Sequence, residues 1–176
     1  MMQVAMLLAA LVANPVARAE PLQSANPLPL LDHLIGRWVL SGTIAGKKTT
    51  HKVSAEWILN HGYVQLHELS REKVAGGRPA YEALIFISFD SGADEFSCLW
   101  LDSTTNSAFT PEGVGHAKVT KEAPNAIPFV FKDSAGHVTF ENTFVYDQKS
   151  NSWEWIMANV TDDKKKPFGH VRLVKK

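Results

Sequence analysis

The sequence predicts an all-β protein, a closed antiparallel meander barrel of about eight to ten strands with one short N-terminal helix. Two observations lead to this fold class. Apolar and polar residues alternate with a period of two through most of the chain, and turn-forming residues recur about every ten residues. No helical pattern separates the strands, so neighbouring strands are expected to be antiparallel. The short connections favour a barrel, in which the last strand pairs with the first, over a sandwich.

One short helix is expected before the first strand. Leu30, Leu31, Leu34 and Ile35 recur at helical spacing, and Gly36 ends the pattern. This segment is expected to plug one end of the barrel, which leaves any opening at the other end.

The first strand places Trp38, Leu40 and Ile44 on one face, and a turn is expected at Gly46-Lys47-Lys48. The second strand alternates in the same way. The residues expected on one face of it are His51, Val53, Ala55, Trp57 and Leu59. The remaining strands are expected at residues 63–71, 81–89, 95–102, 107–119, 129–132, 138–146, 153–160 and 168–174. The pattern over 107–119 is the weakest of these, which gives nine or ten strands in all.

The N-terminal residues predict export. An apolar run over residues 4–13 precedes Ala17-Arg18-Ala19, which has the small-x-small pattern of a signal peptidase site. Residues 1–19 are therefore interpreted as a signal peptide, 20–29 as a Pro-containing linker, and 30–176 as a single barrel domain. The apolar run is too short to span a bilayer, so no transmembrane segment is expected after processing. The expected location is periplasmic or secreted.

Charge and cysteine content narrow the class further. Eighteen basic and eighteen acidic residues balance, which argues against nucleic acid as the main partner. The single cysteine, Cys98, cannot form an intramolecular disulfide and lies in an apolar run. We expect it to be a small buried hydrophobic residue, and the barrel to depend on its core for stability.

The segment Leu34-Ile35-Gly36-Arg37-Trp38, with its Gly-x-Trp pattern at the first strand, resembles the opening motif of lipocalins and other calycins. The resemblance implies that Arg172, in the last strand, stacks its guanidinium on Trp38. Together with the strand that ends at Phe89-Asp90 and with Trp100-x-Asp102, the motif is similar to a bacterial, often exported family known by a domain-of-unknown-function label. That resemblance covers about residues 31–174 and implies a calycin-like barrel, with no catalytic residue to carry over.

A set of aromatic residues is the candidate ligand-binding site, because several of them share the apolar parity of their strands. A barrel of about eight strands is just wide enough for side chains or one small ligand, and a tenth strand widens it. The set could therefore either fill the core or line a pocket for a small hydrophobic ligand. Its members, with one carboxylate, are Trp57, Tyr81, Trp100, Asp102, Trp153 and Trp155.

No motif commits the chain to a chemistry, so no catalytic residue, metal ligand or cofactor is predicted. The histidines form no tight metal-ligand pair, and nucleophile-elbow, phosphate-loop and Cys-x-x-Cys patterns are absent from the sequence. The carboxylates within strands that could face the interior are Glu68, Glu82, Asp102 and Glu141. Binding of a small hydrophobic ligand is the main hypothesis. The alternatives are a ligand-free interaction module, an enzyme acting on a small metabolite, and haem binding through His170.

Overall fold

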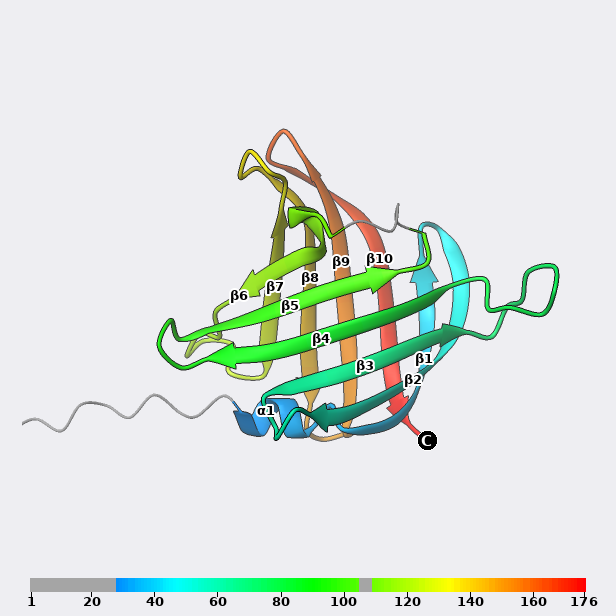
Figure 1. Ribbon diagram of the computed structural model, residues 1–176, viewed down its shortest axis with the longest axis horizontal. Coiled ribbons are helices and arrows are strands. Elements are labelled where there is room, and N and C mark those ends of the chain that lie inside the picture. The colour runs from blue at the N-terminus through cyan, green and yellow to red at the C-terminus, as the bar shows by residue number, and fades with distance from the viewer. Residues whose placement is uncertain (1–27, 105–108) are drawn as a thin grey trace, which may run out of the picture.

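The computed structural model describes residues 28–104 and 109–176, which form a closed barrel of ten antiparallel strands behind one short helix (Figure 1). The fold class predicted from the sequence is confirmed. The elements are α1 (Leu28–Asp32), β1 (Gly36–Ile44), β2 (Lys47–Ile58), β3 (Tyr63–Ser70), β4 (Glu82–Asp90), β5 (Glu95–Asp102), the 3₁₀ turn η1 (Pro111–Gly113), β6 (Val114–Ala117), β7 (Ala126–Lys132), β8 (Val138–Asp147), β9 (Ser152–Thr161) and β10 (Lys164–Lys175).

Each strand pairs with the next along the chain, and β10 returns to pair with β1. That closing ladder runs from the pair Trp38 and Lys175 to the pair Ile44 and Gly169. Figure 1 shows β3, β4 and β5 crossing one side of the barrel and β7 to β10 the other. Every strand has two neighbours, although the short β6 covers only part of β5 and of β7.

Two hairpins are tighter than the sequence suggested, and each turns on two residues. Ala45 and Gly46 join β1 to β2, and Asp162 and Asp163 join β9 to β10. All four have positive φ, between 49° and 76°, as in the two-residue turns whose twist matches that of the flanking strands. Lys47 and Lys48, which were expected in the first turn, therefore begin β2, and β10 begins at Lys164, four residues before the strand expected over 168–174.

The weakly patterned region over 107–119 forms only the four-residue strand β6, which pairs with β7 at two positions. β7 begins at Ala126, three residues before the strand expected over 129–132, and so includes Pro128. Pro128 pairs with Thr143 of β8 on one side, and β6 does not extend far enough to need its missing N–H on the other.

Helix α1 and the residues after it plug one end of the barrel, as expected. Leu31 and Leu34 are fully buried. Three indole N–H groups hold this segment: Trp38 donates to the Leu34 carbonyl at 2.7 Å, Trp153 to the His33 carbonyl at 3.1 Å, and Trp57 to Oδ1 of Asp32 at 2.8 Å. Buried apolar side chains therefore form a core around the plug.

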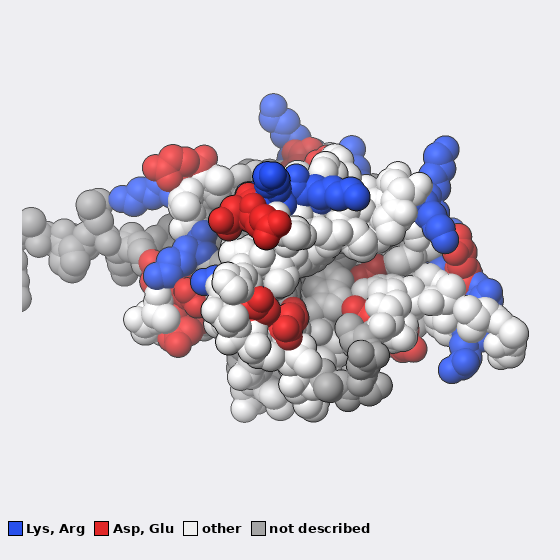
Figure 2. Space-filling model, turned by 90° about the horizontal axis from the view of Figure 1, so that it is seen from above, with Lys and Arg blue, Asp and Glu red and all other residues white. Residues whose placement is uncertain are grey.

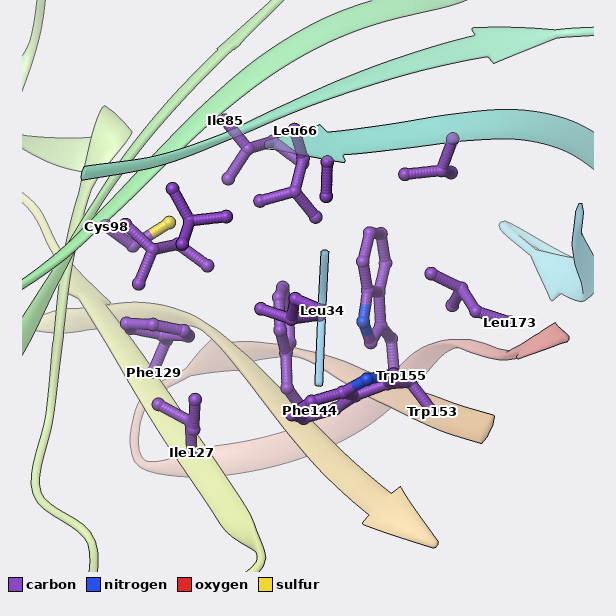
Figure 3. Close-up of a cluster of buried hydrophobic side chains, with 14 of the residues drawn as sticks. Leu34, Leu66, Ile85, Cys98, Ile127, Phe129, Phe144, Trp153, Trp155 and Leu173 are labelled. Carbon is purple, nitrogen blue, oxygen red and sulfur yellow. The ribbon is translucent and has the colours of Figure 1, made fainter. Parts of the chain in front are cut away.

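Figure 3 shows this core, in which side chains converge from strands on opposite sides of the barrel. Leu66 and Ile85 approach from β3 and β4, and Ile127 and Phe144 from β7 and β8. Cys98 lies among them and is 1% exposed, and burial raises the pKa of its thiol well above the usual range. The expected burial of Cys98 is confirmed.

The expected stacking of Arg172 on Trp38 is wrong. Residues 171 and 173 of β10 point inward, so Arg172 between them points outward and donates to the hydroxyls of Ser150 and Ser152. Lys175, which has the inward parity and is paired with Trp38, takes this place, with its Nζ 5.2 Å from the ring centroid.

The signal peptide interpreted over residues 1–19 lies outside the described residues, as does most of the linker over 20–29. The last two linker residues, Leu28 and Pro29, belong to α1, because proline is tolerated in the first turn of a helix. In the part of the chain that the structure describes, no helix is long and apolar enough to cross a membrane.

Candidate ligand-binding cavity

A cavity of about 670 Å³ occupies the half of the barrel farther from α1 and opens between the connecting loops. Its mouth is lined by Lys47 and Lys48 of the first hairpin, Glu72 of the β3–β4 loop, and Phe109 and Glu112 of the β5–β6 loop. Figure 2, which looks onto this end, shows the molecule hollowed there, with acidic side chains at the hollow and basic side chains mostly farther out.

One wall of the cavity is aromatic and apolar. It is formed by inward-facing side chains of β7 to β10, namely Phe131, Phe140, Trp155, Met157 and Phe168. The ring of Trp155 stacks on Phe144 with centroids 4.5 Å apart and meets the edge of Trp100 at 5.9 Å. These contacts fix the indole planes, so the wall is a preformed surface for an apolar ligand.

The opposite wall carries a buried polar network on β2 and β3. His51 Nδ1 contacts Oε1 of Glu68, and His51 Nε2 lies 2.6 Å from the Thr49 hydroxyl. His51 is 5% exposed and Glu68 2% exposed, although both line the cavity. The second carboxylate oxygen of Glu68, Oε2, has no hydrogen-bond partner among the described residues. A buried carboxylate oxygen without a donor is energetically costly, so a donor from a ligand or a water molecule would stabilise it.

Tyr81 links this network to the aromatic wall. Its ring stacks on His51 with centroids 5.5 Å apart, and its hydroxyl accepts a hydrogen bond of 3.1 Å from Nε1 of Trp100. Burial, and then the negative charges of Glu68 and Asp102, raise the pKa of the Tyr81 phenol far above its usual range. The phenol therefore stays protonated and offers a hydrogen-bond donor at all physiological pH values.

Two further polar groups are buried without a partner among the described residues. Nε1 of Trp155 belongs to a cavity-lining ring that is 1% exposed. The side-chain amide of Asn142 is fully buried on the inward face of β8, between its strand neighbours Phe129 and Met157. The interior therefore holds both unsatisfied donors and unsatisfied acceptors.

Asp102 ends β5 at the cavity wall, where its backbone meets the β5–β6 connection. Its Oδ1 accepts hydrogen bonds from the backbone N–H of Thr104 at 2.7 Å and from the Thr104 hydroxyl at 2.5 Å. This double contact holds the carboxylate at the rim of the interior.

The structure brings four of the six predicted site residues to the cavity, namely Tyr81, Trp100, Asp102 and Trp155. The other two, Trp57 and Trp153, hold the α1 segment at the closed end. Trp57 shares the parity of His51 but lies six residues farther along β2, about 20 Å at 3.3 Å per residue. Alternation along a strand predicts the face on which a side chain lies, but not the height of that side chain along the barrel axis.

The strand carboxylates divide between the two faces. Glu68 lies inside and Asp102 lines the cavity, whereas Glu82 and Glu141 point outward and form ion pairs of 2.7 Å with His67 and 2.6 Å with Lys165. His51 and Glu68 were not among the six predicted site residues, although Glu68 was one of the carboxylates that could face the interior. Their signal was parity: His51 alternates with Val53 and Ala55, and Glu68 with Val64 and Leu66.

His170 lies on the outer face of β10, 62% exposed, and its Nε2 is 3.1 Å from Oε2 of Glu154. It cannot reach a molecule in the cavity, so the structure does not support haem binding there through His170. Among residues 28–104 and 109–176, no group of three or more His, Cys, Asp or Glu side chains is close enough to hold a metal ion.

Fold and cavity together define a class: a closed ten-strand antiparallel β-barrel, plugged at one end and open at the other, which fits a calycin-like barrel. Neither a protein-family model nor a curated protein matches the chain. A solved structure described as a redesigned β-barrel is similar to it, with 10% sequence identity and a TM-score of 0.40 over 82% of this chain and 93% of that one.

Proposed function

We propose that this protein is an exported, calycin-like barrel that binds a small, mainly hydrophobic molecule in its open half. The observation that carries the proposal is the cavity of about 670 Å³ with a preformed aromatic wall. That volume falls within the range of roughly 300 to 1,000 Å³ that is usual for small-molecule sites. The N-terminal signal pattern supports export.

The arrangement of the tryptophans favours this function over a ligand-free interaction module. Trp38, Trp57 and Trp153 hold the plug segment, so the closed half already supplies a side-chain core. Trp100 and Trp155 instead line the cavity. A barrel that needed only stability would gain by filling this space, since each unfilled apolar void costs packing energy.

Titration with a neutral apolar dye, N-phenyl-1-naphthylamine, tests the proposal. We expect saturable binding at one site, with quenching of tryptophan fluorescence by energy transfer. Trp100→Ala should weaken binding, because it removes part of the cavity wall and the contact to Trp155. Trp57→Phe is the matched control and should leave dye binding unchanged, since Trp57 lies at the closed end. Absence of saturable binding by the folded wild-type protein would refute the proposed function.

Catalysis is a second candidate, favoured by one observation. The Thr49 hydroxyl, the His51 imidazole and the Glu68 carboxylate follow one another in hydrogen-bond contact on the cavity wall. A histidine held at Nδ1 by a carboxylate and facing a hydroxyl with Nε2 is arranged as a general base. Turnover of small neutral esters that His51→Gln and Thr49→Val both abolish would support catalysis, and equal rates in all three proteins would eliminate it.

A further inference from the structure

The polar network defines a chemical class of ligand. We propose that the cavity takes an apolar amine, a molecule with a hydrophobic body and one protonated amino group, and that the amino group is held by Glu68. This inference rests on the proposed binding function and specifies it. The hydrophobic body lies against the aromatic wall of β7 to β10, and the amino group faces β2 and β3.

The first support is the unused carboxylate oxygen. Oε1 of Glu68 is engaged by His51, and Oε2 has no donor among the described residues although the side chain lines the cavity. A protonated amine supplies several N–H donors, and a charge-assisted bond to a carboxylate is stronger than a neutral one. A ligand carboxylate would instead place like charges together in a buried site.

The second support is the balance of ionisable groups. Apart from Tyr81, the titratable side chains that line the cavity inside its mouth are Glu68, His51 and, at the rim, Asp102. Among the described residues, no lysine or arginine lines the cavity below the mouth. The exposed charges at the mouth cancel, because Lys47 and Lys48 are matched by Glu72 and Glu112. An ammonium group in the cavity therefore meets carboxylates and no lysine or arginine below the mouth, and the charges at the mouth do not oppose it.

The third support is the aromatic surround. Tyr81 and Trp100, joined by their hydrogen bond, lie between the Glu68 network and the ring of Trp155. Aromatic faces attract organic cations, an interaction that strengthens as water is excluded. A carboxylate flanked by such rings is suited to an ammonium group attached to an apolar body.

The test uses three probes that share one ring system and differ in one group. The probes 1-naphthylmethylamine, 1-naphthalenemethanol and 1-naphthoic acid compete with N-phenyl-1-naphthylamine at pH 7. We expect the amine to bind about tenfold more tightly than the alcohol, and the acid to bind most weakly. Equal affinities, or tighter binding of the alcohol or the acid, would overturn the inference while dye binding upholds the proposed function. If the dye itself does not bind, the proposed function fails first.

The Glu68→Gln variant tests whether Glu68 causes the preference for the amine. Glutamine keeps an oxygen that can accept from His51 but has no negative charge, so the amine should lose about tenfold in affinity while the alcohol changes little. Glu141→Gln on the outer face is the matched control and should change neither affinity. If Glu68→Gln does not fold, as judged by circular dichroism, Asp102→Asn should reduce the amine preference in the same direction. An amine preference that survives in the folded carboxylate variants would refute the role of these groups.

Discussion

Lys175 places its ammonium group 5.2 Å from the centre of the Trp38 ring, at the point where the last strand closes on the first. The same indole donates its N–H to the Leu34 carbonyl at 2.7 Å. One side chain thus contacts the plug segment, the first strand and the last strand. Trp38 therefore links the pairing of β1 with β10 to the packing of the plug segment.

We predict that Lys175, and not Arg172, contacts the Trp38 ring, and mutation and NMR can distinguish the two. Lys175→Ala should lower the free energy of unfolding by about 0.5–1 kcal/mol through loss of the cation–π contact. The side-chain protons of Lys175, and not those of Arg172, should be shifted upfield by the Trp38 ring current. Trp38→Phe should cost more, about 1–3 kcal/mol, because it leaves the buried Leu34 carbonyl without its donor. An upfield shift on Arg172 would contradict the assignment.

The buried side-chain amide of Asn142 should lower the free energy of unfolding of the wild-type protein. Both polar atoms of its amide are buried without a partner among the described residues. Replacement by the similarly shaped leucine, Asn142→Leu, should raise the free energy of unfolding by about 1–3 kcal/mol in urea titrations, because it removes the desolvation penalty. Thr143→Val, on the outward face of the same strand, is the control and should change stability by less than about 0.5 kcal/mol. A destabilised Asn142→Leu would show that the amide is satisfied in solution.

Gly42 is required where β1 meets β10. A Cβ at this position would lie 2.2 Å from the carbonyl oxygen of His170 and 2.7 Å from Cα of Val171, and the residue has φ +156°. Because these are backbone atoms of the closing ladder, Gly42→Ala should cost about 3 kcal/mol or more, measured by thermal and urea unfolding.

Gly76, in the β3–β4 loop, supplies the control for this change. It also has a positive φ, +85°, but nothing lies within 4 Å of its would-be Cβ. Gly76→Ala should therefore cost only the backbone strain, about 1–2 kcal/mol. Equal costs for the two variants would mean that β10 moves away from β1 without penalty.

Ionisation of Asp147, at the β8–β9 turn, should make the free energy of unfolding depend on pH. Hydrogen bonds from the Ser150 hydroxyl at 2.5 Å and the Lys149 N–H at 3.0 Å hold the pKa of its carboxyl below the usual value. Since the folded pKa is depressed, the stabilisation is present above the unfolded pKa of about 3.9 and is lost as pH falls through the folded pKa.

Asp147→Asn should therefore be less stable than the wild type at pH 6, and the two should converge near pH 2. Unfolding measured across this range gives the difference directly. Ser150→Ala should raise the Asp147 pKa, observed through its carboxyl carbon in NMR titrations. A constant difference at every pH would show that the effect is steric and not electrostatic.

The fold could be predicted from the sequence because its determinants are local. Alternation of side chains defines the strands, and turn residues every ten positions define the meander. The site could be predicted only in part. Trp57 and Trp100 look alike by parity, yet one holds the plug and the other lines the cavity, since the tilt and stagger of the strands decide height in the barrel. Glu68 was one of four strand carboxylates that could face the interior, and its alternation with Val64 and Leu66 was the signal that distinguished it.

The described chain begins and ends at the same pole of the barrel. Helix α1, which starts at Leu28, and the final residue, Lys176, both lie beside the plugged end in Figure 1. The mouth of the cavity lies at the opposite pole. A fusion partner or surface linker attached at the C-terminus would therefore leave the mouth facing away from the attachment point. An immobilised copy would keep its interior accessible to molecules in the surrounding solution, and this geometry suits the barrel to use as a tethered sensor.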